Sequence, residues 1–306
     1  MKKILVTGAN GFIGRQTLPL LKKGGYEVIA CCLKPVNHSE VKWVQCNLLN
    51  LGEVSKMIRK VQPSHLLHLA WYTEHGKFWE SLENFQWIKA SLHLAYEFAK
   101  FGGRRLMVGG SCCEYDWSHV TGFSEERTPC NPFSVYGRAK NMLRVILEDF
   151  CNLMNISFVW PRIFFLYGPF EDKKKLVASI ILTLLQGKTF TLQNSHYLRD
   201  YLHVEDVAAA IVSLLNSPLQ GPCNIGSGQG VSLKTLGEVI QKTLSSINLL
   251  RYSDSEAPSP GKAIIADATK LQQVVGFTPR ISLEQGMGYA VEWWKKQQQS
   301  SEIRIS

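Results

Sequence analysis

The stretch ILVTGANGFIG at residues 4–14 decides the fold. It joins a short β-branched run to a helical stretch at 15–23, and its three glycines have the spacing G-x-x-G-x-x-G. The first glycine permits a tight turn, the second lets the backbone approach a pyrophosphate, and the third allows the helix to pack closely on the strand. N–H groups at the helix start then face the phosphates. We therefore predict a dinucleotide cofactor bound by Gly8, Gly11, Phe12, Ile13 and Gly14.

Strand-like and helical segments alternate as far as residue 160. The expected strands are 4–6, 27–32, 66–69, 105–108 and 157–160, and the expected helices are 15–23, 51–61, a long helix within 82–100, and 135–153. This order predicts an α/β fold of the Rossmann type, a doubly wound parallel sheet with helices on both faces. The ligand crevice should lie beyond the carboxyl ends of the strands.

The regular alternation ends at Pro161, where aromatic residues, glycines and prolines become frequent. We predict a dinucleotide-binding domain of residues 1–161 plus about 200–228. A smaller, interleaved substrate domain would take about 162–199 plus 229–296, and the polar tail 297–306 should fray. The apolar run 176–185 predicts a buried helix, and the sequence PSPG at 258–261 predicts a long loop.

The composition argues against several classes of protein. Apolar residues make up 45% and charged residues 19%, as in globular proteins, and no apolar run reaches the roughly 18–20 residues of a membrane span. No signal-peptide pattern opens the chain, so we expect a cytoplasmic protein without a membrane partner. The eight cysteines lack C-x-x-C spacing, so neither metal nor redox motif is expected. Lys and Arg exceed Asp and Glu, 34 to 25, but lie scattered, so no nucleic-acid partner is expected.

The end of the second expected strand bears on the choice of cofactor. NAD-binding proteins place an acid there, on the ribose. Cys32 occupies this position and Lys34 follows it. Without a carboxylate nothing repels a 2′-phosphate, and Lys34 would attract it. NADP(H) is favoured, and NAD(H) stays possible if a nearby acid such as Glu40 serves the ribose.

Three side chains form a candidate catalytic set: Ser111, Tyr136 and Lys140. Tyr136 and Lys140 lie four residues apart, so a helix places both on one face. A tyrosine with a reference pKa of about 10 is a poor acid–base, and a nearby ammonium would bring its pKa towards neutrality. Ser111 follows the strand 105–108 and could hydrogen-bond a substrate carbonyl beside Tyr136. Singly, these residues suit a helix surface and a turn cap; their order and context favour catalysis.

These motifs resemble those of the extended short-chain dehydrogenases/reductases, the nucleotide-sugar epimerase/dehydratase/reductase family. The similarity covers nearly the whole chain: TGANGFIG at 7–14, HLA at 68–70, S-x-x-x-Y at 111–115, YGRAK at 136–140, PRIFFLYGP at 161–169, RDYLHVEDV at 199–207 and NIGSG at 224–228. The resemblance implies a nucleotide-sugar substrate and a homodimer built through the two long helices. It implies further cofactor contacts from Asn47, Leu48, Leu69, Ala70, Trp71, Tyr136, Lys140 and Pro161.

The resemblance places substrate contacts at Tyr72, Cys112, Phe165, Arg199 and Lys262. Dehydratases of the family carry Asp-Glu after the active Ser or Thr; here Cys112 and Cys113 stand there, so 4,6-dehydration is not expected. Phe165 replaces an Asn that faces the substrate phosphates. The sequence SPGK at 259–262 stands where the family has R-P-G-D, so the chain loses an Arg there and gains Lys262. Arg199 would meet the nucleotide diphosphate, although Arg199 and the adjacent Asp200 could equally form a surface ion pair.

The segment 68–79 is unusually aromatic, and its rings could stack on a sugar or pack against a dimer helix. The expected function is NADPH-dependent reduction of a nucleotide-linked 4-keto-6-deoxy sugar, in which Tyr136 donates a proton, Ser111 orients the oxygen, and Lys140 tunes Tyr136 and holds the nicotinamide ribose. An NAD(P)-dependent nucleotide-sugar 4-epimerase needs the same three residues and stays open. So does a non-catalytic NADP-binding sensor on this fold.

Overall fold

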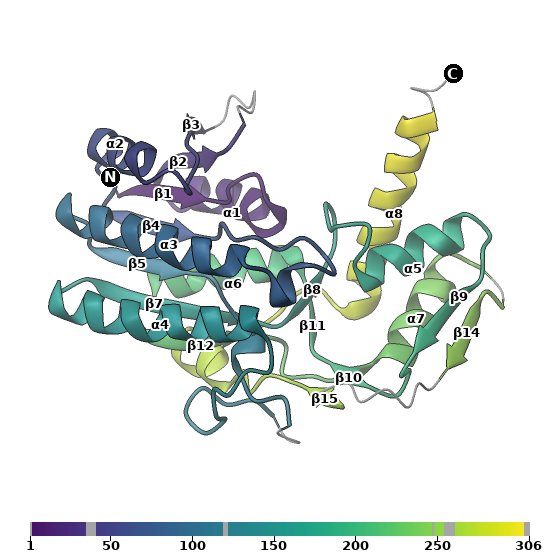
Figure 1. The fold of residues 1–306 in the computed structure, drawn as a ribbon. Coiled ribbons are helices and arrows are strands. Elements are labelled where there is room, and N and C mark those ends of the chain that lie inside the picture. Colours follow the sequence, from purple (N-terminus) through teal and green to yellow (C-terminus); the bar gives the residue numbers. More distant parts are fainter. Residues whose placement is uncertain (1, 35–40, 119–121, 247, 254–260, 303–306) are drawn as a thin grey trace.

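The computed structural model describes residues 2–34, 41–118, 122–246, 248–253 and 261–302. An eight-stranded sheet, parallel at every pairing, forms its centre in the order β12-β7-β5-β4-β1-β2-β3, with β6 beside β7 (Figure 1). The strands are β1 (Lys3–Thr7), β2 (Glu27–Cys32), β3 (Lys42–Gln45), β4 (His65–His68), β5 (Arg105–Val108), β6 (Gly110–Ser111), β7 (Ser157–Ile163) and β12 (Gly221–Ile225).

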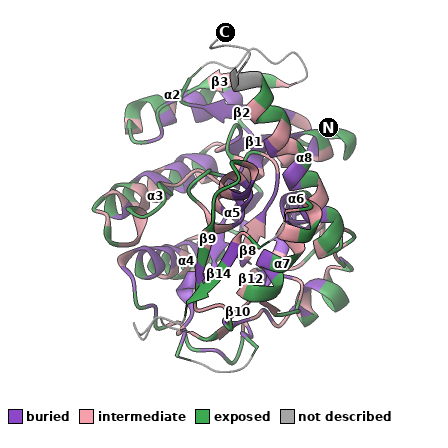
Figure 2. Cartoon of the chain, turned by 90° about the vertical axis from the view of Figure 1, so that its right-hand side faces the viewer, coloured by how far each residue is buried: buried purple, intermediate pink, exposed green. Residues whose placement is uncertain are grey.

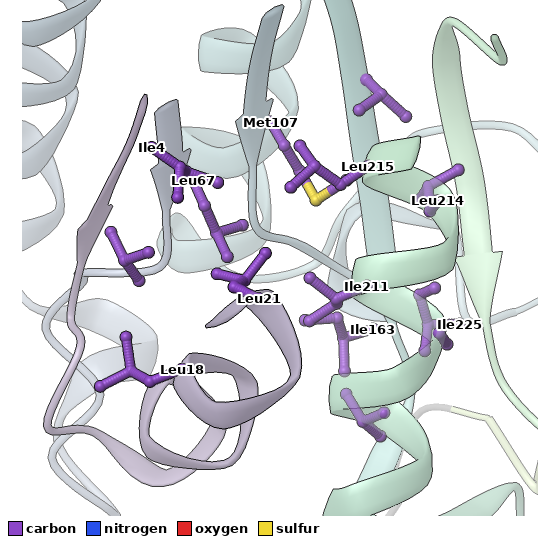
Figure 3. Close-up of a cluster of buried hydrophobic side chains, with 14 of the residues drawn as sticks. Ile4, Leu18, Leu21, Leu67, Met107, Ile163, Ile211, Leu214, Leu215 and Ile225 are labelled. Carbon is purple, nitrogen blue, oxygen red and sulfur yellow. The ribbon is translucent and has the colours of Figure 1, made fainter. Parts of the chain in front are cut away.

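Helices cover both faces of this sheet, which confirms the expected doubly wound fold. On one face lie α1 (Phe12–Lys23) and α6 (Val204–Asn216); on the other lie α2 (Leu51–Val61), α3 (Glu83–Lys100) and α4 (Val135–Leu153). Successive strand residues point to opposite faces. Accordingly Ile4 belongs to the core beneath α1 and α6, drawn in Figure 3, and Leu5 to the core beneath the other three helices.

A smaller part stands beside the carboxyl edge of the sheet and has a buried core of its own. It is built by α5 (Leu176–Leu185), β9 (Phe190–Gln193), α7 (Leu233–Thr243), β14 (Leu250–Ser253) and α8 (Leu283–Glu302), and Figure 2 looks onto it. Short strands join it to the main sheet: β8 (Phe165–Tyr167), β10 (Leu198–Arg199), β11 (Tyr201–His203), β13 (Val231–Ser232) and β15 (Ala263–Ile264). The apolar run 176–185 is the buried helix α5, as the sequence predicts.

Strand β7 continues through Pro161 to Ile163, beyond the expected end at residue 160. Proline cannot donate to a ladder and is rare inside a central strand. Here the ladder to β5 ends with Met107 opposite Val159, and pairing with β6 begins with Gly110 opposite Arg162. Pro161 therefore lies at an interruption of the ladder, where no amide donor is required.

The carboxyl-terminal third differs from the expected division in two places. The helical turn η3 (Lys270–Val274) packs near β12, and Leu271 and Phe277 join the core of the main sheet, although the sequence assigned 229–296 to the substrate domain. Helix α8 reaches Glu302, so 297–302 are helical rather than frayed, because Gln and Glu are good helix formers. Of the loop expected at 258–261, only Gly261 lies within the described residues.

No described helix is long and apolar enough to cross a membrane.

Candidate active site

The glycine turn after β1 is shaped for a phosphate. Gly8 has a φ of +66°, and a Cβ on it would lie 2.8 Å from the amide nitrogen of Ala70. A Cβ on Gly14 would collide with the carbonyl oxygen of Gly8. Helix α1 begins after Gly11 with no side-chain cap and no acid in its first turn. Its N–H groups thus remain available to an anion, and the turn fits the pyrophosphate of a dinucleotide.

The HLA motif fixes the carboxyl end of β4 against this turn. The side chain of His68 is buried between Thr7, at 2.6 Å from Nδ1, and Ser91, at 2.8 Å from Nε2. Burial lowers the pKa of His68 to about 3, so the ring is neutral. The amide of Ala70 donates to the Thr7 hydroxyl at 3.4 Å, and the amide of Leu69 to the Thr7 carbonyl at 3.2 Å. These bonds bring Leu69 and Ala70 to the expected crevice.

At the end of β2 no acid stands among the described residues. The buried thiol of Cys32 donates to the carbonyl oxygen of Lys34 at 2.8 Å, and the Lys34 side chain is exposed. Glu40, the acid that could serve NAD, lies outside the described residues. After β3, Asn47 is exposed and Leu48 is buried.

The three predicted catalytic residues come together where β6 ends and α4 begins. The side chain of Ser111 lowers the pKa of Tyr136, as a neighbouring donor does, and Tyr136 and Lys140 are both buried on α4. The close approach depends on Gly137, whose Cβ would collide with the carbonyl oxygen of Cys113 in the turn η2 (Cys112–Glu114).

The expected effect of Lys140 on Tyr136 stays a prediction, because burial dominates the pKa of both groups in this structure. Burial raises the pKa of Tyr136, the Cys113 thiol adds to the rise, and the hydrogen bond from Ser111 opposes it. Burial lowers the pKa of Lys140 to about 7, against the attraction of the Glu114 charge. The Lys140 amine donates to the carbonyl oxygen of Gly109 at 2.9 Å and lies 3.7 Å from the centre of the Trp71 ring. For Lys140 the loss of water outweighs the attraction of Glu114, and Tyr136, whose pKa is raised, is protonated at neutral pH.

A buried ion pair that sequence reasoning missed supports Ser111 from behind. Glu114 and Arg162 are almost completely buried, and Glu114 accepts hydrogen bonds from Ser111 N at 2.7 Å, Trp160 Nε1 at 2.9 Å and Arg162 Nε at 2.8 Å. Arg162 also donates to the hydroxyl of Tyr115 at 3.0 Å. Ser111 and Glu114 form a capping box on η2. The S-x-x-E spacing was the signal that could have revealed this capping box, although it does not indicate the ion pair with Arg162.

Within the aromatic segment 68–79, some rings pack against a helix and others lie near the candidate catalytic residues. The ring of Trp71 lies 6.1 Å from that of Trp87 on α3, the helix expected in a dimer. Phe78 and Trp79 instead approach Tyr136, with ring centres 4.9 and 6.1 Å away. Tyr72 donates its hydroxyl to Glu74 at 2.9 Å.

The remaining substrate candidates are Cys112, Phe165, Arg199 and Lys262. Cys112 is buried, and its carbonyl oxygen accepts from Trp117. Arg199 is buried, with its guanidinium 5.4 Å from the ring of Phe165 and a hydrogen bond at 3.4 Å to the carbonyl oxygen of Lys262, whose side chain is exposed.

The alternative of a surface ion pair between Arg199 and Asp200 is wrong. Asp200 is completely buried, and its carboxylate accepts from the backbone of Ser227, Gly228 and Ala266. Because Asp200 is already saturated with these donors, it holds the short strands together and does not pair with Arg199.

An exposed stack links the glycine turn to the smaller part of the chain. The guanidinium of Arg15 on α1 lies 4.0 Å from the centre of the Phe170 ring. That ring lies 4.9 Å from Trp293 on α8. Phe170 has a φ of +72°, which is unusual for a residue with a side chain. The stack crosses from α1 to α8 at the rim of the crevice.

With this geometry in view, comparison with known proteins assigns the family. Residues 4–226 match the epimerase family, described as the NAD dependent epimerase/dehydratase family. The chain belongs to this family. Membership confirms the resemblance to the extended short-chain dehydrogenases/reductases and the expectation of a nicotinamide-dependent enzyme of the nucleotide-sugar epimerase/dehydratase type.

Individual relatives are distant in sequence and similar in fold. The dTDP-6-deoxy-L-talose 4-dehydrogenase (NAD(+)) of Aggregatibacter actinomycetemcomitans is 26% identical over 77% of this chain and 88% of its own. A probable UDP-glucuronate 4-epimerase of Rhizobium meliloti is 23% identical over 95% and 96%. The UDP-glucose 4-epimerase of Thermotoga maritima, solved with UDP-glucose, superposes with a TM-score of 0.87 at 24% identity, over 97% of this chain and 99% of its own.

Among the described residues, no group of three or more His, Cys, Asp or Glu side chains is arranged to hold a metal ion. The eight cysteines are free thiols, seven of them buried.

Proposed function

We propose that the chain reduces a nucleotide-linked 4-keto-6-deoxy sugar with NADPH. The observation that carries this proposal is the buried Tyr136 beside Ser111, where β6 ends and α4 begins. Reduction of a ketone needs a proton donor at the carbonyl oxygen, and a tyrosine that is protonated at neutral pH can be that donor. The main sheet and its glycine turn would hold the cofactor, and the smaller part the nucleotide sugar.

Each residue of the set then has a defined task. Bound NADPH supplies the hydride to C4. Tyr136 gives its proton to the C4 oxygen, and the Ser111 hydroxyl, fixed by the capping box on η2, orients that oxygen. Lys140 holds the nicotinamide ribose with its amine. Arg199 offers a positive charge to the diphosphate of the substrate, and the surplus of basic residues over the whole chain favours such an anion.

The choice of NADPH rests on Cys32. An acid at this position would bind the ribose and repel a 2′-phosphate. The uncharged thiol leaves room for the phosphate, and the exposed amine of Lys34 can pair with it.

A 4-epimerase is the second candidate, because two observations favour it. The compared structures of UDP-glucose and UDP-glucuronic acid 4-epimerases superpose over nearly the whole chain, and the latter was solved with NAD. An epimerase also needs Ser111, Tyr136 and Lys140, since it oxidises and then reduces the same carbon. It differs in returning the hydride to its own substrate, so it consumes no reduced cofactor.

Cofactor consumption separates the two. Purified protein is offered 4-keto-6-deoxy sugars on dTDP, CDP and GDP with NADPH, and the loss of NADPH absorbance is followed. In parallel, UDP-glucose and UDP-galactose are incubated without added cofactor. We expect stoichiometric NADPH oxidation with one keto sugar and no interconversion of the UDP-sugars. Interconversion without NADPH oxidation on any keto sugar would establish the epimerase instead.

We also propose that two copies associate through α3 and α4, which lie side by side on one face of the sheet (Figure 1). Their outer surface exposes Phe85, Tyr96, Met142, Val145 and Ile146. Such an apolar face on two neighbouring helices suits a symmetric interface. Ile146→Glu should convert the dimer to a monomer in sedimentation equilibrium, and a monomeric wild type would contradict the proposal.

A further inference from the structure

Four neighbouring rings, two of which contact Tyr136, form what we call the aromatic wall: Phe78, Trp79, Trp117 and Phe133. Phe78 and Trp79 come from the short helix η1 (Phe78–Glu80), and their ring centres lie 4.9 and 6.1 Å from that of Tyr136. Trp79 contacts Trp117 at 6.2 Å and Phe133 at 5.6 Å. Three segments that are separated in the sequence thus place their rings in one continuous set of contacts beside the proton donor.

The four rings of the wall carry two polar atoms between them, the indole nitrogens of Trp79 and Trp117. The indole N–H of Trp117 already donates to the carbonyl oxygen of Cys112 at 2.9 Å, and the two phenylalanine rings have no polar atom. The nearby carboxylate of Glu114 is completely buried and satisfied by its donors behind Ser111. Part of the wall stays accessible, since Phe133 is 44% exposed and Trp79 is half-buried.

We propose that the aromatic wall recognises C6 of the sugar and selects a methyl group there over a hydroxyl or a carboxylate. The inference rests on the proposed function, because it takes the C4 oxygen to lie at the Tyr136 hydroxyl. C6 is bonded to C5, the ring neighbour of C4, so its substituent lies beside the ring that donates the proton. A methyl group gains free energy on an apolar surface, whereas a hydroxyl or carboxylate without hydrogen-bond partners loses it.

The same reasoning separates this chain from uronate enzymes. A carboxylate at C6 needs a cation or several donors. Arg199, the guanidinium among the candidate substrate residues, instead donates to the carbonyl oxygen of Leu198 at 2.8 Å and packs on Phe165 and Tyr197. The wall therefore excludes the charged C6 group that a glucuronate carries.

Binding to a matched ligand series tests the wall without requiring turnover. Calorimetric titration with NADP⁺ present compares dTDP-linked 6-deoxygalactose, galactose and galacturonic acid, which differ only at C6. We expect the 6-deoxy sugar to bind about 10–200-fold more tightly than galactose, the range for one small group in an apolar pocket. Trp79→Gln should reduce this ratio to below about threefold, and Trp79→Phe should keep most of it. If no member of the series binds on dTDP or on UDP, the proposal is wrong.

Phe101→Ala is the control, because it truncates a ring at the far end of α3 and should leave the ratio unchanged. If Trp79→Gln unfolds, Phe133→Gln replaces it, since that ring is more exposed, and the same loss of selectivity is expected. A wild-type ratio below threefold, or an unchanged ratio in the glutamine variant, would overturn the wall as the selector. Selective binding of the 6-deoxy sugar without NADPH oxidation would contradict only the proposed reaction. NADPH oxidation without this selectivity would contradict only the role of the aromatic wall.

Discussion

Glu114→Gln tests how strongly the buried ion pair stabilises the chain. The substitution keeps the size of the side chain and removes its charge, so Arg162 is left buried without its counter-charge. Breaking such a pair costs about 3–5 kcal/mol. For a chain of 306 residues the entropy of unfolding is about 0.6 kcal/mol/K, which converts this cost to a fall in melting temperature of about 5–8 °C.

Thermal unfolding followed by circular dichroism measures the fall. Glu74→Gln is the control, because its partner Lys77 is exposed and the loss of that pair should not change the melting temperature measurably. Adding Arg162→Met to Glu114→Gln should recover much of the loss, since no buried charge then remains. A fall of less than about 2 °C in Glu114→Gln, or no recovery in the double variant, would refute the reasoning.

Three further predictions concern the site itself. Tyr136→Phe should lower the turnover rate about 10²–10⁴-fold and leave the NADPH dissociation constant within about twofold, as stopped-flow kinetics and fluorescence titration would check. The pKa of Lys140 is lowered to about 7 by burial from 10.5, so burying its charge destabilises the native state below pH 7, and this cost disappears as the pH rises towards 10. The free energy of unfolding, measured with urea at several pH values, should therefore rise more steeply with pH for wild type than for Lys140→Met, by up to about 1.4 kcal/mol per pH unit in this window. A constant difference between the two proteins would contradict the burial of the amine. Cys32→Asp should shift the ratio of NADPH to NADH affinity at least about tenfold towards NADH, and an unchanged ratio in titrations would mean that this position does not select the cofactor.

Local patterns predicted the main sheet and its helices well. The structure gives α4 the bounds expected from the sequence, Val135–Leu153, because apolar periodicity and the capping residue Ser134 act within one helix. The glycine turn was equally predictable. At each of its glycines a Cβ would meet backbone that lies a few residues away or at the end of the neighbouring strand of the sheet. Strand β3 was missed because it is short and half-exposed, so neither burial nor alternation marks it.

Features that depend on distant partners were not predictable. Glu114 and Arg162 lie 48 residues apart and meet only through the pairing of β6 with β7. Nothing near Pro161 indicates that the ladder is interrupted opposite it. The orientation of the aromatic segment depended on which neighbours each ring met, Trp87 for Trp71 and Tyr136 for Phe78. The raised pKa of Tyr136 has the same origin, because its largest cause is burial by side chains that are remote in the sequence.

The stack of Arg15, Phe170 and Trp293 joins α1 to α8 through partly exposed side chains. A contact of this kind between a cation and a ring contributes roughly 0.5–1 kcal/mol. The left-handed backbone of Phe170 costs on the order of 1 kcal/mol, which offsets most of this gain. We therefore expect the stack to hold the two helices together only weakly, so that a ligand bound between them would have to stabilise their approach through its own contacts.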